Sequence, residues 1–251
     1  MDAVVLPIPA SEAKPWLLLK HYAKRVPQIC FAFGLYVDGD MRGVVTYGIP
    51  ANKNLNRLGG ASTLELNRLC VDDDMPRNSS SFTVGRSLRL IPAPTCVVSY
   101  ADQDQGHIGY IYQATNWLYT GMGSGDVEFE KDGKRSHRKA LFSIYGTGSR
   151  ANAEANGYTA VDVSAKHRYV FFVGNKREKK EMAAALPWPV IPYPKGETAR
   201  YDAGPRIAAQ PLLFLEAPSS RAVRKATTSV AKAANDNLPT PSAADLFANA
   251  A

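Results

Sequence analysis

Long hydrophobic runs and cysteines are both scarce in this sequence of 251 residues. No apolar run approaches the roughly 20 residues that a membrane-spanning helix needs, and residues 1–15 lack the basic-then-apolar pattern of a secretory signal. The three cysteines, Cys30, Cys70 and Cys96, are widely spaced in apolar, strand-like segments, so we expect neither a disulfide framework nor a zinc site. These absences predict a cytoplasmic protein in a reducing compartment, with no membrane association.

Internal repeats are also missing, and the composition changes along the chain. The hydrophobic content of 45% is enough for one sizeable core. From about Thr198 onward Ala, Pro, Ser and Thr dominate and no hydrophobic period is sustained. We therefore expect a folded domain over residues 1–197 and a disordered or loosely attached tail over residues 198–251.

Positive charge is concentrated in one part of the chain. Residues 131–195 carry 13 Lys and Arg against 5 Asp and Glu, whereas residues 1–130 carry 11 against 13. A basic region of this kind suits a polyanion such as nucleic acid, although solvated basic loops would give the same composition. The candidate phosphate-binding residues are Lys134, Arg135, His137, Arg138, Arg168, Lys176 and Arg177.

The stretch 99–121 brings together the signals of a strand, a loop and a helix. Residues 96–100 are typical of a buried strand, and a helical period starts near Gly106. One face of that expected helix is apolar, and another carries Tyr112. A carboxylate, Asp102, at the carboxyl end of a strand, followed by a helix that displays a tyrosine, is a usual placement for a site in an open α/β sheet. A strand packed on an amphipathic helix, with Tyr112 half-buried, would produce the same pattern.

A second candidate lies near the start of the chain. Residues 16–25 read as a short amphipathic helix that stops before Pro27 and carries His21 and Tyr22. A histidine beside a tyrosine can act as an acid, a base or a ligand, but it can equally be ordinary surface or core decoration.

Residues 72–90 have the features of an anion-binding helix start. Ser79, Ser80 and Ser81 are good N-cap residues for a helix that runs through Leu88, and Arg77 flanks its beginning. The free N–H groups and the positive dipole end of such a helix suit a phosphate, although an ordinary capped helix looks the same. The other elements expected are strands at 29–37, 42–47, 63–71, 127–129, 140–145 and 166–173, a loop with at most one helical turn at 146–160, a basic helix at 176–186 and an extended proline-rich segment at 187–195.

This order of elements resembles the GNAT acyltransferase superfamily. The resemblance implies an α/β (α+β) fold, in which helices flank a mixed, mostly antiparallel central sheet that gains an extra C-terminal strand and helix. It matches Pro76 to Ser81 to the loop that holds the pyrophosphate of an acyl-thioester cofactor, with serines where the superfamily has glycines. The residues it implies for donor binding are Arg68, Arg77, Asn78, Ser79, Ser80, Ser81, Arg86 and Ser87.

A narrower resemblance rests on longer strings, namely LKHYAKRVP, ELNRLCVDDDMPRNSSSFTVGRSLRL, VSYADQDQGHIGYIYQATNWLYTG and KHRYVFFV with the later PYPK. Over roughly residues 16–196 these strings resemble the Mom family of phage DNA-modification proteins. The resemblance implies conversion of adenine N6 in duplex DNA to N6-carbamoylmethyladenine, which protects phage DNA from restriction in the bacterial host cell.

The same resemblance assigns roles to four residues. It implies catalytic roles for His21, Tyr22, Asp102 and Tyr112, with Asp102 as base or metal ligand and Tyr112 as the acid for the leaving group. It also implies that iron binds to His21 and Asp102, and His107 could complete a set of two histidines and one carboxylate. Because the adenine amine is out of reach inside a duplex, we expect base flipping. The candidates to stack on the extruded base are Trp117, Tyr110 and Tyr22.

The donor and the partners follow from the atoms transferred. Acetyl-CoA brings two carbons and an oxygen but no nitrogen, whereas a glycyl group has the same atoms as carbamoylmethyl, so the donor is acetyl-CoA or a glycyl donor such as glycyl-tRNA. The expected partners are double-stranded DNA and, with the second donor, tRNA; no oligomeric state is predicted. Two other functions fit the same residues: an ordinary GNAT N-acetyltransferase acting on a protein or small amine, and a non-enzymatic DNA-binding protein.

Overall fold

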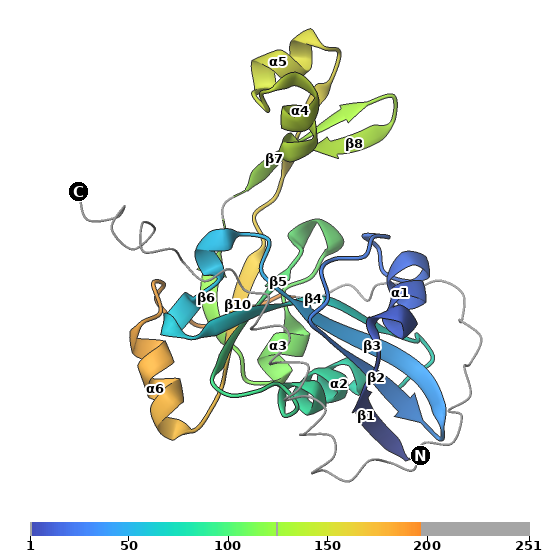
Figure 1. Cartoon of the computed structure of the whole chain (residues 1–251), viewed down its shortest axis with the longest axis vertical. Helices are drawn as coiled ribbons and strands as arrows, with labels where there is room; N and C mark the ends of the chain where they lie inside the picture. Colours follow the sequence, from blue (N-terminus) through green and yellow to red (C-terminus); the bar gives the residue numbers. More distant parts are fainter. Residues whose placement is uncertain (1, 124, 197–251) are drawn as a thin grey trace. The chain divides into compact units, whose positions relative to one another are not determined.

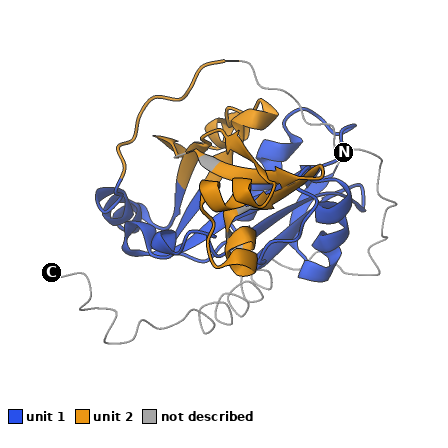
Figure 2. Ribbon diagram, turned by 90° about the horizontal axis from the view of Figure 1, so that it is seen from above, with its two compact units in different colours: residues 1–98, 171–187, 202–251 blue, residues 99–170, 188–201 orange. Residues whose placement is uncertain are grey.

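The computed structural model describes residues 2–123 and 125–196 (Figure 1). These residues divide into two compact units, which Figure 2 shows in different colours. The first unit contains residues 2–98 and 171–187, and the second contains 99–123, 125–170 and 188–196. The tail expected at 198–251 lies outside the described residues. None of the helices within residues 2–123 and 125–196 has the length and hydropathy that spanning a bilayer requires.

A seven-stranded sheet has the order β1-β2-β3-β4-β5-β10-β6, and the division between the units falls inside β5 and β10. Its strands are β1 (Ala3–Pro7), β2 (Phe31–Val37), β3 (Asp40–Gly48), β4 (Ser62–Val71), β5 (Thr95–Ala101), β6 (Leu118–Met122) and β10 (His167–Val173). The pairs from β1 to β4 and the pair of β10 with β6 are antiparallel, and β4 pairs with β5 in parallel. The mixed, mostly antiparallel α/β fold expected from the sequence is therefore confirmed.

Local chemistry accounts for the turn between β2 and β3 in the first unit. Asp38 and Gly39 both adopt positive φ, which is the geometry that a tight β2–β3 hairpin turn needs and that Asp-Gly favours. The parallel pairing of β4 with β5 runs from Ser62 opposite Thr95 to Glu65 opposite Val98, although β4 continues to Val71. The helices of this unit are α1 (Ala10–Leu19), α2 (Ser79–Leu88) and α6 (Lys176–Ala184), with short 3-10 turns at Lys53–Leu55 and Leu58–Gly60.

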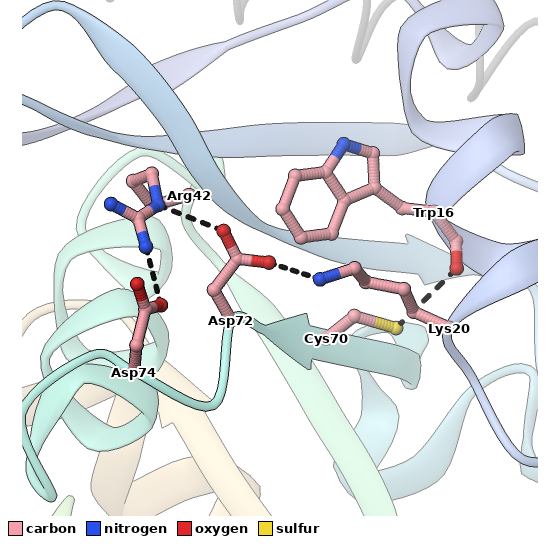
Figure 3. A network of polar contacts seen from close by, with 6 residues as sticks. All are labelled: Trp16, Lys20, Arg42, Cys70, Asp72 and Asp74. Atoms are coloured by element: carbon pink, nitrogen blue, oxygen red, sulfur yellow. Dashed lines mark hydrogen bonds and ion pairs between the residues drawn. The ribbon is translucent and has the colours of Figure 1, made fainter. Parts of the chain in front are cut away.

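A buried charge network joins α1 to the end of β4 (Figure 3). Lys20 and Asp72 are 2% and 3% exposed and form an ion pair, and Arg42 Nε donates a hydrogen bond of 2.8 Å to the other oxygen of Asp72. Arg42 also pairs with the exposed carboxylate of Asp74. The Lys20 ammonium lies 5.0 Å from the ring centre of Trp16, within an apolar cluster of this unit. The network fixes the point where β4 ends and the loop to α2 begins.

The second unit holds a smaller sheet with its own core. Its strands have the order β8-β7-β9, with β7 at Asp126–Lys131, β8 at Lys134–His137 and β9 at Thr159–Val163. Helices α4 (Arg138–Tyr145) and α5 (Arg150–Ala155) accompany them, and Phe129, Leu141 and Ala153 form a fully buried cluster. We call residues 126–163 the insertion module, because they stand between β6 and β10 in the chain.

Three expectations about elements are wrong. The expected helix at 16–25 begins earlier, at Ala10, and ends at Leu19, so His21 and Tyr22 follow α1. The single helix expected from Gly106 to Tyr119 does not form. This segment contains a short helix, α3 (Tyr110–Ala114), and then strand β6, because Asn116 takes positive φ and Leu118 and Tyr119 pair with β10. The expected strand 140–145 is part of helix α4, whose Leu141 and Tyr145 face the module core.

The other elements agree with the sequence except at their ends. Strands β2, β3, β4, β5 and β10 and helices α2 and α6 are confirmed, and residues 185–196 contain no helix or strand, as the prolines require. β1, β8 and β9 were not expected, and α5 is the helical turn anticipated within 146–160.

Candidate functional site

Asp102 is held in place at the end of β5 in the second unit. The residue is 8% exposed and caps a 3-10 turn, Gln103–Gln105, with its Oδ1 accepting the backbone N–H of Asp104 at 3.1 Å. Its Oδ2 accepts a hydrogen bond from Lys166 Nζ at 2.6 Å. A carboxylate with this pairing is fixed in orientation and compensated in charge. Lys166 had not been singled out, because it stands 64 residues away in the sequence.

A histidine and a tyrosine lie on the next strands of the same unit. His167 is 5% exposed, its Nδ1 shares a hydrogen bond of 2.8 Å with Tyr119 Oη, and its Nε2 lies 3.3 Å from the amide nitrogen of Gln103. Burial lowers the pKa of His167 and raises the pKa of Tyr119, so both side chains favour their neutral forms.

His107 follows the turn that Asp102 caps. Its backbone N–H donates to the carbonyl of Asp102 at 3.0 Å, so its placement depends on that turn. Burial lowers the pKa of the His107 imidazole, and the negative charge of Asp102 opposes this shift. A neutral imidazole can accept a proton or a metal ion, which keeps His107 a candidate.

Tyr112 lies on α3 among aromatic rings. Ser99 Oγ donates a hydrogen bond of 2.8 Å to its hydroxyl oxygen, and the rings of Trp117 and Tyr169 each have centres 5.1 Å from its own. A donor to the phenol oxygen stabilises the phenolate that remains after a proton leaves. Ser99 is a functional candidate that the sequence did not single out; its position in the strand before Asp102 was the available signal.

Tyr169 anchors α3 to β10. Its hydroxyl donates to the carbonyl of Ile108 at 2.5 Å, and burial raises its pKa to about 12, so it stays protonated at neutral pH. Gly109 takes positive φ and lies so close that an added Cβ would overlap the Tyr169 ring, which explains the glycine. Trp117 is fully buried, so the expectation that it stacks on a flipped base is wrong; Tyr110 is 49% exposed and Tyr22 is 37% exposed, and both remain candidates.

His21 and Tyr22 belong to the first unit. His21 is 7% exposed, its Nδ1 accepts the backbone N–H of Ala23 at 3.1 Å, and its ring centre lies 4.3 Å from that of Tyr22. Arg68 is near this pair. Burial and the charge of Arg25 lower the pKa of Arg68, and Tyr22 partly opposes this shift. The His21 imidazole is therefore shielded from solvent, whereas the Tyr22 ring that packs beside it stays partly exposed.

The arrangement does not fit the iron site expected at His21 and Asp102. An imidazole whose Nδ1 accepts a hydrogen bond carries its proton on Nε2, so neither nitrogen offers a lone pair to a metal ion. The oxygen of Asp102 that Lys166 contacts faces an ammonium group, which repels a cation. Within residues 2–123 and 125–196 no cluster of three His, Cys, Asp or Glu residues could hold a metal.

Only some of the residues expected to bind the donor are accessible at the start of α2. Its N-cap is Asn78, which makes no capping hydrogen bond through its side chain, and Ser81 Oγ donates to the carbonyl of Asn78 at 2.9 Å. Ser79 is 8% exposed, whereas Ser87 is fully buried and its Oγ lies 2.6 Å from Tyr47 Oη. Ser87 is therefore a packing residue, and the accessible groups at this end are those of Arg77, Asn78, Ser80 and Ser81. Arg86 is exposed further along α2.

The basic candidates occupy different settings. Lys134, Arg135 and Arg138 are exposed on β8 and the start of α4, and Arg135 lies 3.5 Å from Glu130. Arg168 donates from Nε and Nη2 to Thr120, both at 2.9 Å, and its guanidinium lies over the Trp188 ring at 3.5 Å; burial lowers its pKa. Arg168 therefore joins β10 to β6 and the proline-rich segment. Lys176 and Arg177 begin α6 in the first unit, Arg177 pairing with Glu181, and His137 ends β8.

Together these features define a mixed α/β protein. Its second unit holds a paired carboxylate, Asp102 with Lys166, and a supported tyrosine, Tyr112, whose hydroxyl accepts a hydrogen bond from Ser99. Its first unit holds the start of helix α2, whose geometry suits an anion. The model of the Mom protein family matches residues 2–195, and the chain belongs to that family. It is 33% identical over 198 residues to "Methylcarbamoylase mom" of Escherichia phage Mu, covering 73% of this chain and 80% of that protein.

Solved structures give weaker likenesses. A GNAT family acetyltransferase from Bacillus cereus ATCC 10987 superposes with a TM-score of 0.38 at 9% identity, covering 70% of this chain and 100% of that chain. An IAA acetyltransferase from Bacillus cereus ATCC 14579 gives a TM-score of 0.34 at 13% identity, covering 68% and 100%.

Proposed function

We propose that the protein is a transferase that converts adenine N6 in duplex DNA to N6-carbamoylmethyladenine and thereby protects phage DNA from restriction. The observation that carries the proposal is membership of the Mom family, with 33% identity to a methylcarbamoylase over most of both chains. The paired carboxylate and the supported tyrosine are the side chains that such a transfer uses.

Asp102 serves as the base in this proposal. The exocyclic amine of adenine is a poor nucleophile because its lone pair is delocalised into the ring, so it must lose a proton as it attacks. Asp102 is held by Lys166 and by the Asp104 backbone, which orients its carboxylate before substrate arrives. Lys166 Nζ then stabilises negative charge that develops beside the carboxylate.

Tyr112 serves as the acid for the leaving group. It gives its proton to the departing thiolate or alkoxide, and the hydrogen bond from Ser99 stabilises the resulting phenolate. The aromatic rings of Trp117 and Tyr169 hold the phenol in one orientation. Tyr169 is a poor alternative acid, because burial raises its pKa to about 12 and its hydroxyl already bonds the Ile108 carbonyl.

The donor in this proposal is a glycyl ester, with glycyl-tRNA as the candidate. Transfer of the glycyl group to N6 forms an amide and releases the alcohol of the ester. The glycyl amine then attacks ring carbon C6, the bond from C6 to the original nitrogen breaks, and one proton moves to the departing amide nitrogen. The product is the carbamoylmethyl isomer, and no oxidant is needed. Arg77, Asn78, Ser80 and Ser81 at the start of α2 would contact a phosphate of the donor, whether RNA or CoA.

Isotope labelling of expressing cells separates the two donors. Labelled glycine should enter the modified adenine as an intact unit, nitrogen included. Entry of labelled acetate carbon without glycine would exclude the glycyl donor and favour acetyl-CoA with a separate nitrogen source.

The test of the function itself pairs modification with DNA affinity. Nucleosides from plasmid DNA of cells expressing the protein should contain N6-carbamoylmethyladenine, and Asp102→Ala should remove it while the purified variant still binds duplex DNA. Unmodified adenine with soluble wild-type protein present would reject the proposal. Acetylation of a protein or small amine without DNA would instead support an ordinary N-acetyltransferase.

A further inference from the structure

Arg68 of β4 is a half-buried cation that lacks sufficient counter-charge. Its Nη1 donates to the carbonyl of Asn67 at 2.5 Å, whereas its buried Nε has no hydrogen-bond partner among the described residues. Burial and the charge of Arg25 lower the pKa of Arg68, and the smaller effects of Tyr22 and Glu65 do not offset them. Because a guanidinium group keeps its charge at neutral pH, this position is unfavourable until an anion binds there.

The segment after α1 crosses β4 and is anchored on both sides of Arg25. Before Arg25, Lys20 forms its buried ion pair at the end of β4 (Figure 3). After it, the carbonyl of Gln28 accepts a hydrogen bond of 3.0 Å from Asn67 Nδ2. Arg25 itself is exposed, and its charge acts on Arg68. The fold therefore holds two guanidinium groups near each other despite their repulsion.

Arg68 faces α1 and the segment after it, not α2. Arg68 and Cys70 are two residues apart on β4, so they share one face of the sheet, and Cys70 belongs to the apolar cluster that α1 covers. Val44 of β3 belongs to the same cluster, so Tyr47, three residues further along, lies on the other face. There its hydroxyl is 2.6 Å from Ser87 of α2. An anion at Arg68 is therefore bound on the face opposite to the one that α2 covers.

Tyr22 adds an aromatic surface beside the two arginines. It is 37% exposed, and its ring packs on His21 from the side that remains. A guanidinium group binds a phosphate through paired hydrogen bonds, and an exposed aromatic ring stacks on a nucleobase. A phosphate next to a base is the repeating unit of a nucleic acid, so these three side chains match one nucleotide.

We propose that Arg25 and Arg68 bind one backbone phosphate of the DNA, next to the nucleotide whose base contacts Tyr22. This inference rests on the proposed function for DNA as the acceptor. A phosphate oxygen accepts a hydrogen bond from Nε of Arg68, and the phosphate supplies the counter-charge that this guanidinium group lacks. The phosphate of the donor is left to the start of α2.

The first test uses purified full-length protein and short duplexes, each with a single A·T pair in a different sequence context. Each phosphate in turn is replaced by an uncharged methylphosphonate, and affinity is measured by fluorescence anisotropy. Wild-type protein should lose about 10-fold in affinity at one position, as expected for one charged hydrogen-bonded contact. Arg68→Gln and Arg25→Gln should bind the unmodified duplex about 10-fold more weakly and no longer respond to that replacement. Lys14→Gln, which removes an exposed charge from α1, is the matched control and should respond like wild type.

A second measurement separates a phosphate site from an arginine that only supports the fold. Inorganic phosphate, compared with chloride at equal ionic strength, should raise the midpoint of thermal unfolding less for Arg68→Met than for wild type or Lys14→Gln. Without phosphate, Arg68→Met should unfold at no lower temperature than wild type, because it removes a charge that lacks counter-charge. A lower unfolding temperature for Arg68→Met without phosphate would make Arg68 a structural residue and overturn the inference.

The remaining outcomes separate the inference from the proposed function. If both arginine variants bind the duplexes and respond to each methylphosphonate as wild type does, the phosphate site is rejected, even when the wild type modifies adenine in cells. If the variants lose the phosphate contact but the wild type never modifies adenine, the site stands and the proposed function falls. Weaker binding of coenzyme A or glycyl-tRNA by the variants, with duplex binding unchanged, would assign the two arginines to the donor and overturn the inference.

Discussion

Replacement of Asp72 by Asn tests how the first unit is held together. The substitution keeps the size of the side chain but leaves Lys20, which is 2% exposed, and Arg42 without their shared anion. Removal of one partner from a buried ion pair costs about 3–5 kcal/mol, because the remaining charge stays desolvated. For a folded region of about 200 residues, each kcal/mol lowers the midpoint of thermal unfolding by about 2–4 °C. We therefore expect Asp72→Asn to lower that midpoint by about 6–20 °C.

The measurement is urea and thermal unfolding followed by circular dichroism and by tryptophan fluorescence, since Trp16 lies over Lys20. Asp74→Asn is the matched control: it removes a carboxylate that also pairs with Arg42 but is 60% exposed, so it should cost no more than about 1 kcal/mol. Adding Lys20→Met to Asp72→Asn should recover part of the loss, because it removes the stranded charge. A decrease in the free energy of unfolding of less than about 1 kcal/mol for Asp72→Asn would show that the buried ion pair does not hold this unit together.

Three further predictions concern the second unit. Tyr112→Phe should lower the rate of adenine modification by about 100-fold or more with the fold intact, because it removes the acid and keeps the ring, as modification assays and circular dichroism will check. Wild-type protein should lose stability as pH falls below the ordinary histidine pKa of 6.5, since burial lowers the pKa of His167 and the unfolded chain binds the proton first; His167→Gln should flatten this part of a stability-against-pH curve. Lys134→Gln and Arg135→Gln should each reduce the slope of log affinity against log salt for duplex DNA by about 0.9, as fluorescence anisotropy will show.

Each of these has an outcome that contradicts it. Unchanged modification by Tyr112→Phe would remove Tyr112 from the role of acid. A wild-type stability that does not change between about pH 7 and pH 5 would contradict the neutral state of buried His167. An unchanged salt slope in both basic variants would place the phosphate contacts elsewhere, and Lys53→Gln on an exposed 3-10 turn of the first unit serves as the control.

The sequence predicted those elements whose local chemistry and packing agree. The Asp-Gly hairpin, the strand before Asp102 and the α6 helix, which begins with an Asn175 and Glu178 capping box, were all recognisable from neighbouring residues. The prediction of one helix from Gly106 to Tyr119 was wrong because the 3.6-residue spacing of its apolar residues was coincidental. Leu118 and Tyr119 belong to a strand, and the strand that pairs with it, β10, is about 50 residues away in the sequence. The prediction of a strand at 140–145 was wrong because the aromatic and branched residues of this segment suit a strand as well as a short helix that packs on one face.

The candidate site was predictable only in part, for a related reason. Asp102 and Tyr112 stand out because each follows or lies in a recognisable element. Their partners Lys166 and Ser99 depend on how the chain folds back, and no spacing in the sequence marks the pairing of Asp102 with Lys166. The burial of Lys20 was equally hidden, since an isolated lysine at the end of a helix is usually exposed.

Adenine modification by this protein is tested most directly by mass analysis of nucleosides in plasmid DNA from cells that express the wild-type chain, Asp102→Asn or the control Val190→Ala. We expect a nucleoside with the mass of one added carbamoylmethyl group in the wild-type and Val190→Ala samples, and none with Asp102→Asn at equal amounts of soluble protein. Unmodified adenine in the wild-type sample, or equal modification with Asp102→Asn, would contradict it.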